Sequence, residues 1–302
     1  MLLGVLPQWT GVFCALWTPT DARGRLLERA LHSNLEFLQQ RGVTGLLPLG
    51  STGEFLHLDL PTRKVFLLEL VKQIDPARLI VNLTDIRPAA VVELARFVKQ
   101  LGCGAVSLLP PYFYPVDQED LREWFIRGAA AADLPLFLYN FPERTGNRIE
   151  LETIAAVADA VPVVGVKQSG AEFSYHRALV ELGRKRNFVV LTGSDTRLPE
   201  AVALGVNGCV SGLANAVPDL VRAAYEEACQ GVAPEAQAAA SKLTELAVEI
   251  QKVQFPLHVA AAMEARGLAV GSPKALVSRG TERRYEQLVA RLGELYRQWK
   301  LT

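Results

Sequence analysis

Short apolar runs alternate with longer amphipathic segments along most of this chain. Eight of the runs are rich in β-branched residues and have the length of strands buried on both faces. They span residues 11–18, 45–50, 78–84, 105–111, 135–142, 163–169, 188–195 and 208–213. Segments with apolar residues at helical spacing lie between them, for example residues 25–40, 61–74, 88–101, 121–132, 151–160 and 218–230. This alternation is typical of an α/β fold whose parallel sheet is covered by helices.

The number of repeats favours a closed barrel over an open sheet. Eight strand and helix units fit into roughly 220 residues, as in a (β/α)8 or TIM barrel. No glycine-rich nucleotide-binding motif follows any of the runs, so the usual reason for an open sheet is missing. Later in the chain the pattern is helical alone, over residues 234–253, 256–267 and 281–300. We therefore expect a barrel formed by residues 1–230 and a C-terminal helical region, residues 231–302, packed on it.

Composition and charge narrow the classes of function. The chain has 302 residues, with 32 Lys and Arg against 32 Asp and Glu, so the formal net charge is zero. There is no overall basic field to attract nucleic acid or an acidic membrane surface. Hydrophobic residues make up 50% of the chain, enough for a large core, and no run approaches the ~20 apolar residues of a membrane span. We expect a cytoplasmic protein with neither nucleic acid nor a membrane as partner.

The cysteines point to neither a metal site nor a disulfide framework. Cys14, Cys103, Cys209 and Cys229 lie far apart, and none of them belongs to a CxxC pair. We expect all four to be reduced and most of them to be buried as small apolar side chains.

Lys167 ends the sixth apolar run, in the segment VPVVGVKQSG. Active sites of such barrels lie at the C-terminal ends of the strands. The period of two in a strand places Lys167 on the same face as Gly165 and Val163. If that face points inward, loss of hydration favours the neutral amine that forms a Schiff base. The alternative is a strand-end lysine that reaches solvent.

Tyr139 and Arg144 follow the fifth run. Tyr139 shares a strand face with Phe137 and Pro135, so its phenol is expected at the barrel mouth, either as a proton shuttle for Lys167 or as a core tyrosine bonded to backbone. Arg144 lies in a short loop between a proline and a glycine. Its planar fork of donors could bind a carboxylate, or it could be an exposed arginine without a role.

The second run continues into GSTGE, residues 50–54. Gly50 and Gly53 flank Ser51 and Thr52, so backbone amides and two hydroxyls can converge on one anion. The position at the end of a barrel strand favours a site for a carboxylate or phosphate over a simple tight turn.

These motifs together resemble the dihydrodipicolinate synthase / N-acetylneuraminate lyase family. The resemblance rests on GSTGE at 50–54, YNFPERTG at 139–146 and GVK at 165–167, in the family's order and spacing. The segments GVFCALWTP, PPYFYP and LTGSD with GCVSGLAN extend it over almost the whole barrel. The resemblance implies a TIM barrel, a class I mechanism with neither metal nor cofactor, pyruvate or another 2-oxo acid as substrate, and a homotetramer.

The resemblance also implies roles for residues of the pyruvate site. Lys167 matches the lysine that forms the Schiff base, and Tyr139 matches the general acid/base. Ser51 and Thr52 match the pair that holds the substrate carboxylate, with Ser51 also relaying protons to Tyr139.

Other positions concern the second substrate and the proton relay. Arg144 matches the arginine that meets the second substrate's carboxylate in the synthase branch, and Val210 matches a residue with a strained backbone carbonyl near the lysine. The relay tyrosine of the synthase branch is replaced by Phe113, which Tyr112 and Tyr114 flank.

Several activities therefore stay open at this point. Arg144 favours 4-hydroxy-tetrahydrodipicolinate synthase, whereas Phe113 argues against it. A 2-keto-3-deoxy sugar acid aldolase, 4-hydroxy-2-oxoglutarate aldolase or N-acetylneuraminate lyase would use the same imine chemistry, with Asp195 and Thr196 placed to contact a polyhydroxyl tail. A catalytically silent 2-oxo-acid-binding barrel is disfavoured, because a binding role needs no nucleophilic amine.

Overall fold

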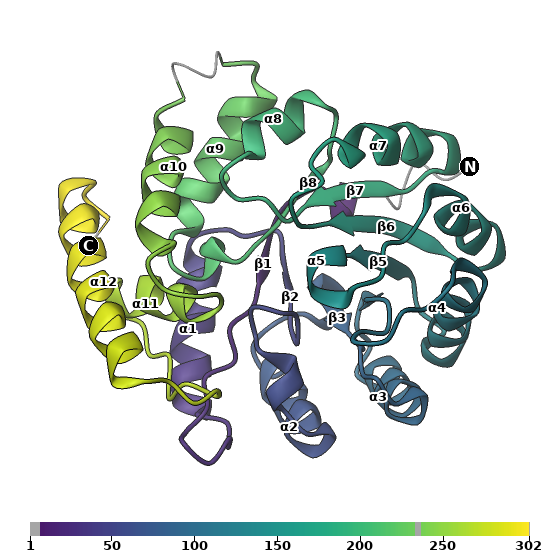
Figure 1. Cartoon of the computed structure of the whole chain (residues 1–302), viewed down its shortest axis with the longest axis horizontal. Coiled ribbons are helices and arrows are strands. Elements are labelled where there is room, and N and C mark those ends of the chain that lie inside the picture. The colour runs from purple at the N-terminus through teal and green to yellow at the C-terminus, as the bar shows by residue number, and fades with distance from the viewer. Residues whose placement is uncertain (1–6, 233–236, 302) are drawn as a thin grey trace.

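The computed structural model describes residues 7–232 and 237–301, and they form a barrel of eight parallel strands (Figure 1). The strands are β1 (Gly11–Ala15), β2 (Gly45–Leu47), β3 (Ile80–Asn82), β4 (Ala105–Leu108), β5 (Leu136–Asn140), β6 (Val163–Gln168), β7 (Val189–Thr192) and β8 (Gly208–Ser211). Their order is β2-β1-β8-β7-β6-β5-β4-β3. A parallel bridge between Leu46 and Leu79 joins β2 to β3 and closes the barrel. The predicted (β/α)8 fold is confirmed.

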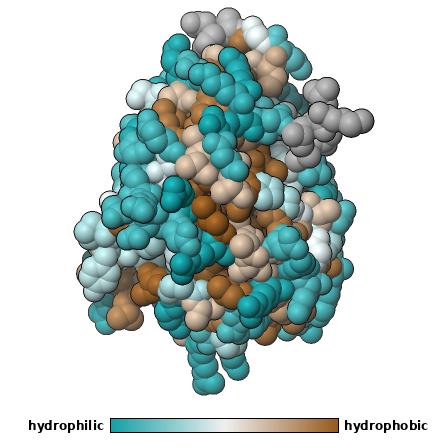
Figure 2. All heavy atoms as spheres, turned by 90° about the vertical axis from the view of Figure 1, so that its right-hand side faces the viewer, coloured by the Kyte–Doolittle hydropathy of each residue, from teal (hydrophilic) through white to brown (hydrophobic). Residues whose placement is uncertain are grey.

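Helices follow each strand and surround the barrel (Figure 1). They are α1 (Glu28–Gln40), α2 (Leu60–Leu70), α3 (Pro88–Gln100), α4 (Gln118–Ala132), α5 (Pro142–Thr145), α6 (Leu151–Ala160), α7 (Tyr175–Arg186), α8 (Leu198–Ala203) and α9 (Pro218–Cys229). On the side of the molecule in Figure 2, hydrophobic side chains gather in a band between hydrophilic ones. No helix within the described ranges is both long and apolar enough to span a membrane.

An inner cluster of side chains fills the barrel. It consists of Trp9, Phe13, Ala15, Leu47, Ile80, Ala105, Phe137, Val164, Val189, Leu191 and Val210. Trp9, from the turn before β1, packs edge-on against Phe137 with ring centroids 5.4 Å apart. A Cβ on Gly165 would lie 2.1 Å from the Phe137 ring, so only glycine leaves room for that ring. The filled interior leaves the C-terminal ends of the strands as the place for a site.

A bulge in β6 corrects one prediction. The expectation that Val163 shares the inward face with Gly165 and Lys167 is wrong, because Val163 packs outside the barrel and Val164 belongs to the inner cluster. The pairing with β5 shifts register here, from Leu136 opposite Val163 to Phe137 opposite Gly165. A bulge inserts one residue and so resets the alternation. Lys167 keeps its predicted inward direction because it lies beyond the bulge.

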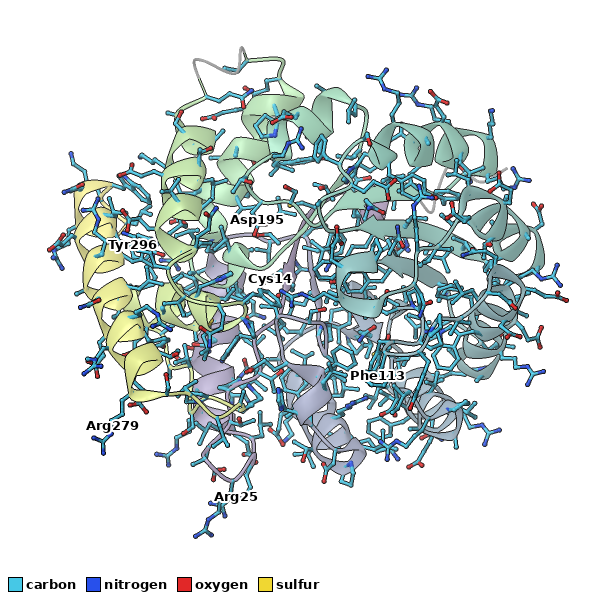
Figure 3. All side chains as sticks on the ribbon, in the orientation of Figure 1. Cys14, Arg25, Phe113, Asp195, Arg279 and Tyr296 are labelled. Atoms are coloured by element: carbon cyan, nitrogen blue, oxygen red, sulfur yellow. The ribbon has the colours of Figure 1, made fainter. Side chains whose placement is uncertain are left out.

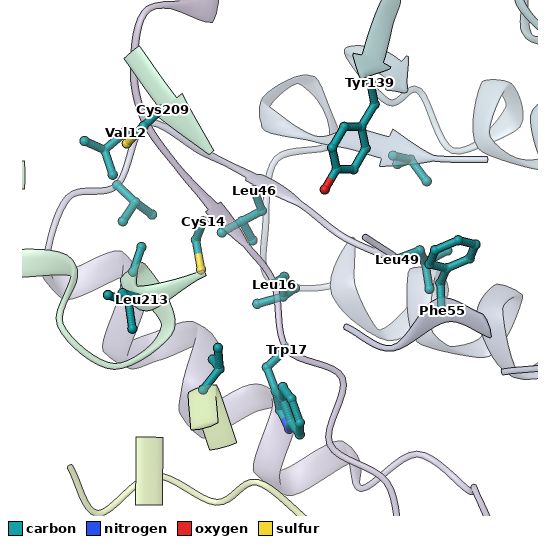
Figure 4. Close-up of a cluster of buried hydrophobic side chains, with 14 of the residues drawn as sticks. Val12, Cys14, Leu16, Trp17, Leu46, Leu49, Phe55, Tyr139, Cys209 and Leu213 are labelled. Atoms are coloured by element: carbon teal, nitrogen blue, oxygen red, sulfur yellow. The ribbon is translucent and has the colours of Figure 1, made fainter. Parts of the chain in front are cut away.

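The outer cluster comprises the side chains that strands and helices bury against one another, among them Cys14, Leu46 and Leu213 (Figure 4). Cys14, Cys103 and Cys209 are buried and Cys229 is exposed, and all four are free thiols. The expectation of reduced and mostly buried cysteines is confirmed.

Three further helices follow the barrel: α10 (Ala238–Ile250), α11 (Leu257–Ala265) and α12 (Arg279–Gln298). α10 lies beside α9, and α12 lies beside α11 (Figure 1), which confirms the predicted helical appendage. The first residues of the predicted segment 234–253 lie outside the described residues. Hydrogen bonds from Trp17 Nε1 to the Val270 carbonyl and from Asn34 Nδ2 to the Ala269 carbonyl, each 2.9 Å, tie this region to the barrel. The division at residue 230 stays a prediction.

Candidate active site

A cavity of about 280 Å³ opens at the C-terminal ends of the barrel strands. All six residues that the sequence predicted for the site line it, namely Ser51, Thr52, Tyr139, Arg144, Lys167 and Val210. They come from the loop after β2, from β5, α5, β6 and β8, so the fold brings together residues up to about 160 positions apart. The cavity therefore lies where the barrel architecture predicts a site.

Lys167 reaches the cavity from β6 and is only 4% exposed. Its strand neighbours in register are Tyr139 on β5 and Leu191 on β7. Its Nζ lies 4.0 Å from the centroid of the Tyr139 ring. A Cβ on Gly193 would lie 3.4 Å from Lys167 Cε and 2.1 Å from Ser169 Oγ, so this glycine makes room for both side chains. Among the described residues no carboxylate forms an ion pair with Lys167, so its amine is directed at the cavity.

Tyr139 is buried, and its hydroxyl lies 3.4 Å from Ser51 Oγ. Its ring stacks on Phe141 with centroids 6.1 Å apart. Figure 4 shows the phenol extending from β5 with its hydroxyl at the free end. Burial raises the pKa of Tyr139, but the positive charge of Lys167 and hydrogen bonds with Ser51, Lys167 and Ser169 outweigh it and lower the pKa overall. The phenol is therefore coupled to the amine and to two hydroxyls that can carry its proton.

Ser51 and Thr52 occupy the turn after β2. The amide of Glu54 donates to the Ser51 carbonyl at 3.1 Å and closes the turn. Thr52 is buried and faces the backbone after β8, since a Cβ on Gly212 would lie 3.3 Å from its Oγ1. Two hydroxyls thus line the cavity across from Lys167, where they can bind an anionic group of a small molecule.

Arg144 lies at the mouth, on α5. Its guanidinium carbon is 5.9 Å from the Phe141 ring centroid and 5.3 Å from that of Phe255. Arg144 is exposed and pairs with no carboxylate among the residues described, so its donors are free to bind a ligand at the mouth. Val210, on β8, pairs in register with Phe13 and lines the cavity with a buried side chain. The strained carbonyl expected at Val210 stays a prediction.

A second hollow, of about 370 Å³, meets the cavity at Ser51, Arg144 and Phe255. Tyr112 lines this hollow, and its pKa is raised by burial and by Asp85, against the opposing charge of Arg63. Phe113 has a positive φ of 81° and is 85% exposed. Of the two tyrosines beside Phe113, Tyr112 is the one placed near the site, since Tyr114 is 72% exposed and lines neither hollow.

Asp195 and Thr196, the residues expected to contact a polyhydroxyl tail, differ in position. Asp195 lines the cavity and lies near Cys14 (Figure 3), whose thiol pKa is raised by burial and by the charge of Asp195. Its Oδ2 accepts a hydrogen bond of 3.2 Å from the Leu213 amide. Burial raises the pKa of Asp195, although Ser211, the Leu213 amide and Lys167 act in the opposite direction. Thr196 does not line the cavity.

The cavity also contains residues that sequence reasoning missed. Ser169 follows Lys167 by two positions, so the strand period could have identified it. Phe255 and His258 come from the C-terminal helical region and line the cavity beside Arg144. Nothing in their local sequence signals this role, because they reach the site through the packing of α10 and α11 on the barrel.

Comparisons with known proteins agree with this geometry. The model of the dihydrodipicolinate synthetase family matches residues 8–294. The 4-hydroxy-tetrahydrodipicolinate synthase of Methanothrix thermoacetophila is 28% identical over 95% of this chain and 98% of its own length.

Solved structures agree as well. YagE, a prophage protein of the dihydrodipicolinic acid synthase family from E. coli K12 solved in complex with pyruvate, has a TM-score of 0.86 at 25% identity, covering 97% of this chain and 99% of its own. A variant of the 2-keto-3-deoxygluconate aldolase of Sulfolobus solfataricus shares the fold at 20% identity, with a TM-score of 0.83 over 96% of this chain and 98% of its own. Because the family model covers nearly the whole chain, the chain belongs to the dihydrodipicolinate synthetase family, whose members are class I pyruvate-dependent lyases and aldolases.

Proposed function

We propose that this protein is a Schiff-base-forming, pyruvate-dependent lyase or aldolase similar to 4-hydroxy-tetrahydrodipicolinate synthase. One observation carries the proposal: the amine of Lys167 is buried at a cavity beside Tyr139, without an ion-pair partner in the described part of the chain. A buried amine that faces a cavity is suited to attack a carbonyl carbon. The family membership supports the same chemistry.

In the proposed first step, the hydroxyls of Ser51 and Thr52 bind the carboxylate of pyruvate, which places the keto carbon at Lys167 Nζ. The amine adds to this carbon. The oxygen takes one proton from the amine and one from Tyr139 and leaves as water, so Tyr139 becomes a phenolate. The imine nitrogen keeps one proton and so carries a positive charge. The Ser51 hydroxyl, 3.4 Å from that of Tyr139, can relay protons to and from the phenolate.

The protonated imine then acts as an electron sink. The adjacent methyl carbon loses a proton to the Tyr139 phenolate, and the resulting enamine attacks the carbonyl carbon of a second substrate to form a carbon–carbon bond. The carbonyl oxygen takes that proton from Tyr139. Water then hydrolyses the product imine, which frees the Lys167 amine and returns a proton to Tyr139. The same steps in reverse cleave that bond. Arg144, at the cavity mouth, binds the carboxylate of the second substrate with its fork of donors.

A sugar-acid aldolase is the second candidate. Asp195 favours it, because a carboxyl group in the cavity can bind hydroxyls of a polyhydroxyl tail. Cleavage of 2-keto-3-deoxy acids, 4-hydroxy-2-oxoglutarate or N-acetylneuraminate would all use the Lys167 imine. Phe113, which replaces the relay tyrosine of the synthase branch, also favours an activity outside that branch.

We also propose a cytoplasmic homotetramer. Phe113 and Tyr114 pack edge-on against each other, with ring centroids 4.9 Å apart, and both are exposed in the single chain. A pair of exposed aromatic rings supports an association that covers them. Sedimentation equilibrium measures the mass of the assembly directly.

Borohydride reduction in the presence of pyruvate tests the mechanism. The reduced adduct should map to the peptide that contains Lys167, and it should be absent without pyruvate. Lys274 provides an internal control, since its side chain is also buried, at 3% exposure, but is paired with Glu54. An adduct on Lys274 or on surface lysines, with none on Lys167, would contradict the proposal. A screen of aldehydes and 2-oxo acids with pyruvate then identifies the second substrate.

A further inference from the structure

His258 enters the cavity from the C-terminal region. It is the second residue of α11 and lines the same cavity as Lys167, Arg144 and Asp195. It is thus the polar side chain that α11 contributes to the cavity, where the C-terminal region otherwise places the apolar side chains of Ile250, Phe255 and Val259.

Two contacts orient the imidazole ring. Its Nδ1 lies 3.3 Å from the carbonyl oxygen of Val253, and its ring packs against Phe255 with centroids 5.6 Å apart at 62°. A carbonyl oxygen only accepts hydrogen bonds, so Nδ1 must carry the proton and donate it. The other ring nitrogen, Nε2, has no hydrogen-bond partner among residues 7–232 and 237–301.

The surroundings of His258 keep this ring neutral. Burial lowers the pKa of His258, the bond to Val253 opposes this, and the positive charge of Arg144 lowers the pKa further. A neutral ring protonated at Nδ1 presents a lone pair at Nε2. His258 therefore offers the cavity a hydrogen-bond acceptor next to the donors of Arg144.

An acceptor distinguishes between chemical groups of a ligand. A carboxylate or a carbonyl oxygen has no hydrogen to give to Nε2, whereas a hydroxyl group does. Arg144 and His258 together thus suit a molecule with two features. One is an oxygen that accepts hydrogen bonds from the guanidinium, and the other is a hydroxyl group that donates one to the imidazole. A substrate without the hydroxyl leaves a buried acceptor without a partner, which weakens its binding.

We propose that His258 is a specificity-determining residue whose Nε2 accepts a hydrogen bond from a hydroxyl group that the second substrate already carries. The inference rests on the proposed function, since it assigns the second substrate of the Lys167 imine to the hydroxyaldehydes. It reaches beyond that function because it selects one class of second substrate among those that the imine chemistry allows.

The test compares two aldehydes of equal chain length, glyceraldehyde and propanal, each with pyruvate. The ratio of their kcat/KM values is measured for the wild type, for His258→Leu, which lacks the acceptor, and for His258→Gln, which restores one. We expect the ratio to favour glyceraldehyde in the wild type, to fall about tenfold in His258→Leu, the scale of one buried hydrogen bond, and to recover at least partly in His258→Gln.

A second histidine gives a matched control. His176, on α7, has the same local geometry, with Nδ1 2.9 Å from the Phe173 carbonyl and its ring against Phe173, but it does not line the cavity. His176→Leu should leave the ratio unchanged, and since a ratio does not depend on the fraction of folded enzyme, partial unfolding cannot imitate the effect.

The outcomes separate the two proposals. If the wild type forms the pyruvate adduct at Lys167 but the ratio is the same in His258→Leu as in the wild type, the inference about His258 is overturned and the proposed function stands. The inference also fails if His176→Leu lowers the ratio as much as His258→Leu. If no adduct forms at Lys167, the proposed function fails, and the assignment of His258 fails with it.

Discussion

Two lysines of this protein are almost completely withdrawn from solvent, and their surroundings differ. Lys274, in the loop before α12, has a side chain 3% exposed, pairs with Glu54 at 2.8 Å and lies 4.6 Å from the Trp17 ring centroid. Lys167 is 4% exposed and faces a cavity, and its neighbour is the phenol of Tyr139 and not a paired carboxylate. Burial is thus common to both residues, and the partner distinguishes them.

The difference indicates what each lysine does. Burial lowers the pKa of Lys274, and the negative charge of Glu54 and its hydrogen bond offset part of this by favouring the ammonium form. That pair ties the C-terminal loop to the turn that carries Ser51 and Thr52. Lys167 forms no ion pair within the described residues, although the carboxyl of Asp195 lines the same cavity, and Tyr139 beside it can exchange protons. A charge-paired lysine suits a structural contact, whereas an amine facing a cavity suits covalent chemistry.

Replacing each lysine by methionine should show most clearly that the two lysines have different roles. Lys167→Met removes the nucleophile, so we expect no pyruvate adduct after borohydride reduction and a loss of turnover of about 10³-fold or more. Lys274→Met should still form the adduct at Lys167. Mass spectrometry of both variants measures the difference, and an adduct in Lys167→Met would assign the nucleophile to another lysine.

Tyr139→Phe tests the surroundings of Lys167, because it removes the hydroxyl next to the amine and keeps the aromatic ring. We expect kcat to fall by roughly 10²–10⁴-fold, the usual scale for a positioned acid/base, because the hydroxyl that exchanges protons with the substrate is lost. Steady-state kinetics measure this, with circular dichroism as the control for folding. An unchanged kcat would show that Tyr139 contributes packing and no acid/base catalysis.

Lys274→Met should act on stability. It leaves the carboxylate of Glu54 buried without a partner, so we expect the free energy of unfolding to fall by about 3–5 kcal/mol. The double variant Glu54→Gln with Lys274→Met removes both charges and should regain part of that loss. Urea denaturation followed by fluorescence measures both values, and equal losses in the two variants would exclude charge pairing as the cause.

Arg144→Lys should have the smallest effect. Lysine keeps the positive charge but lacks the planar pair of donors, so we expect kcat/KM for a second substrate with a carboxylate to fall about tenfold. Formation of the pyruvate adduct should persist, because Arg144 lies at the mouth and not beside Lys167. Loss of the adduct itself would place Arg144 in the pyruvate site. An unchanged kcat/KM would favour the sugar-acid aldolase.

Much of this protein could be predicted from the sequence. The alternation of apolar runs and amphipathic segments was sufficient for a (β/α)8 barrel, since the strands of such a barrel are buried on both faces. Short motifs at the ends of those runs pointed to five residues that line one cavity, and the family resemblance added a sixth, Val210. The fold and the position of those five residues were predictable because both depend on local patterns, namely the period of a strand and the residues that directly follow it.

Long-range packing decided the rest. The bulge that moves Val163 out of the barrel depends on how β6 pairs with β5, and the pairing of Lys274 with Glu54 joins residues 220 positions apart. His258 reaches the cavity because α11 docks against the barrel, more than 80 residues along the chain from β6. A strand period or a short motif describes only neighbours in the chain. Which distant side chains meet is set by packing in three dimensions, and for this protein that packing completes the site.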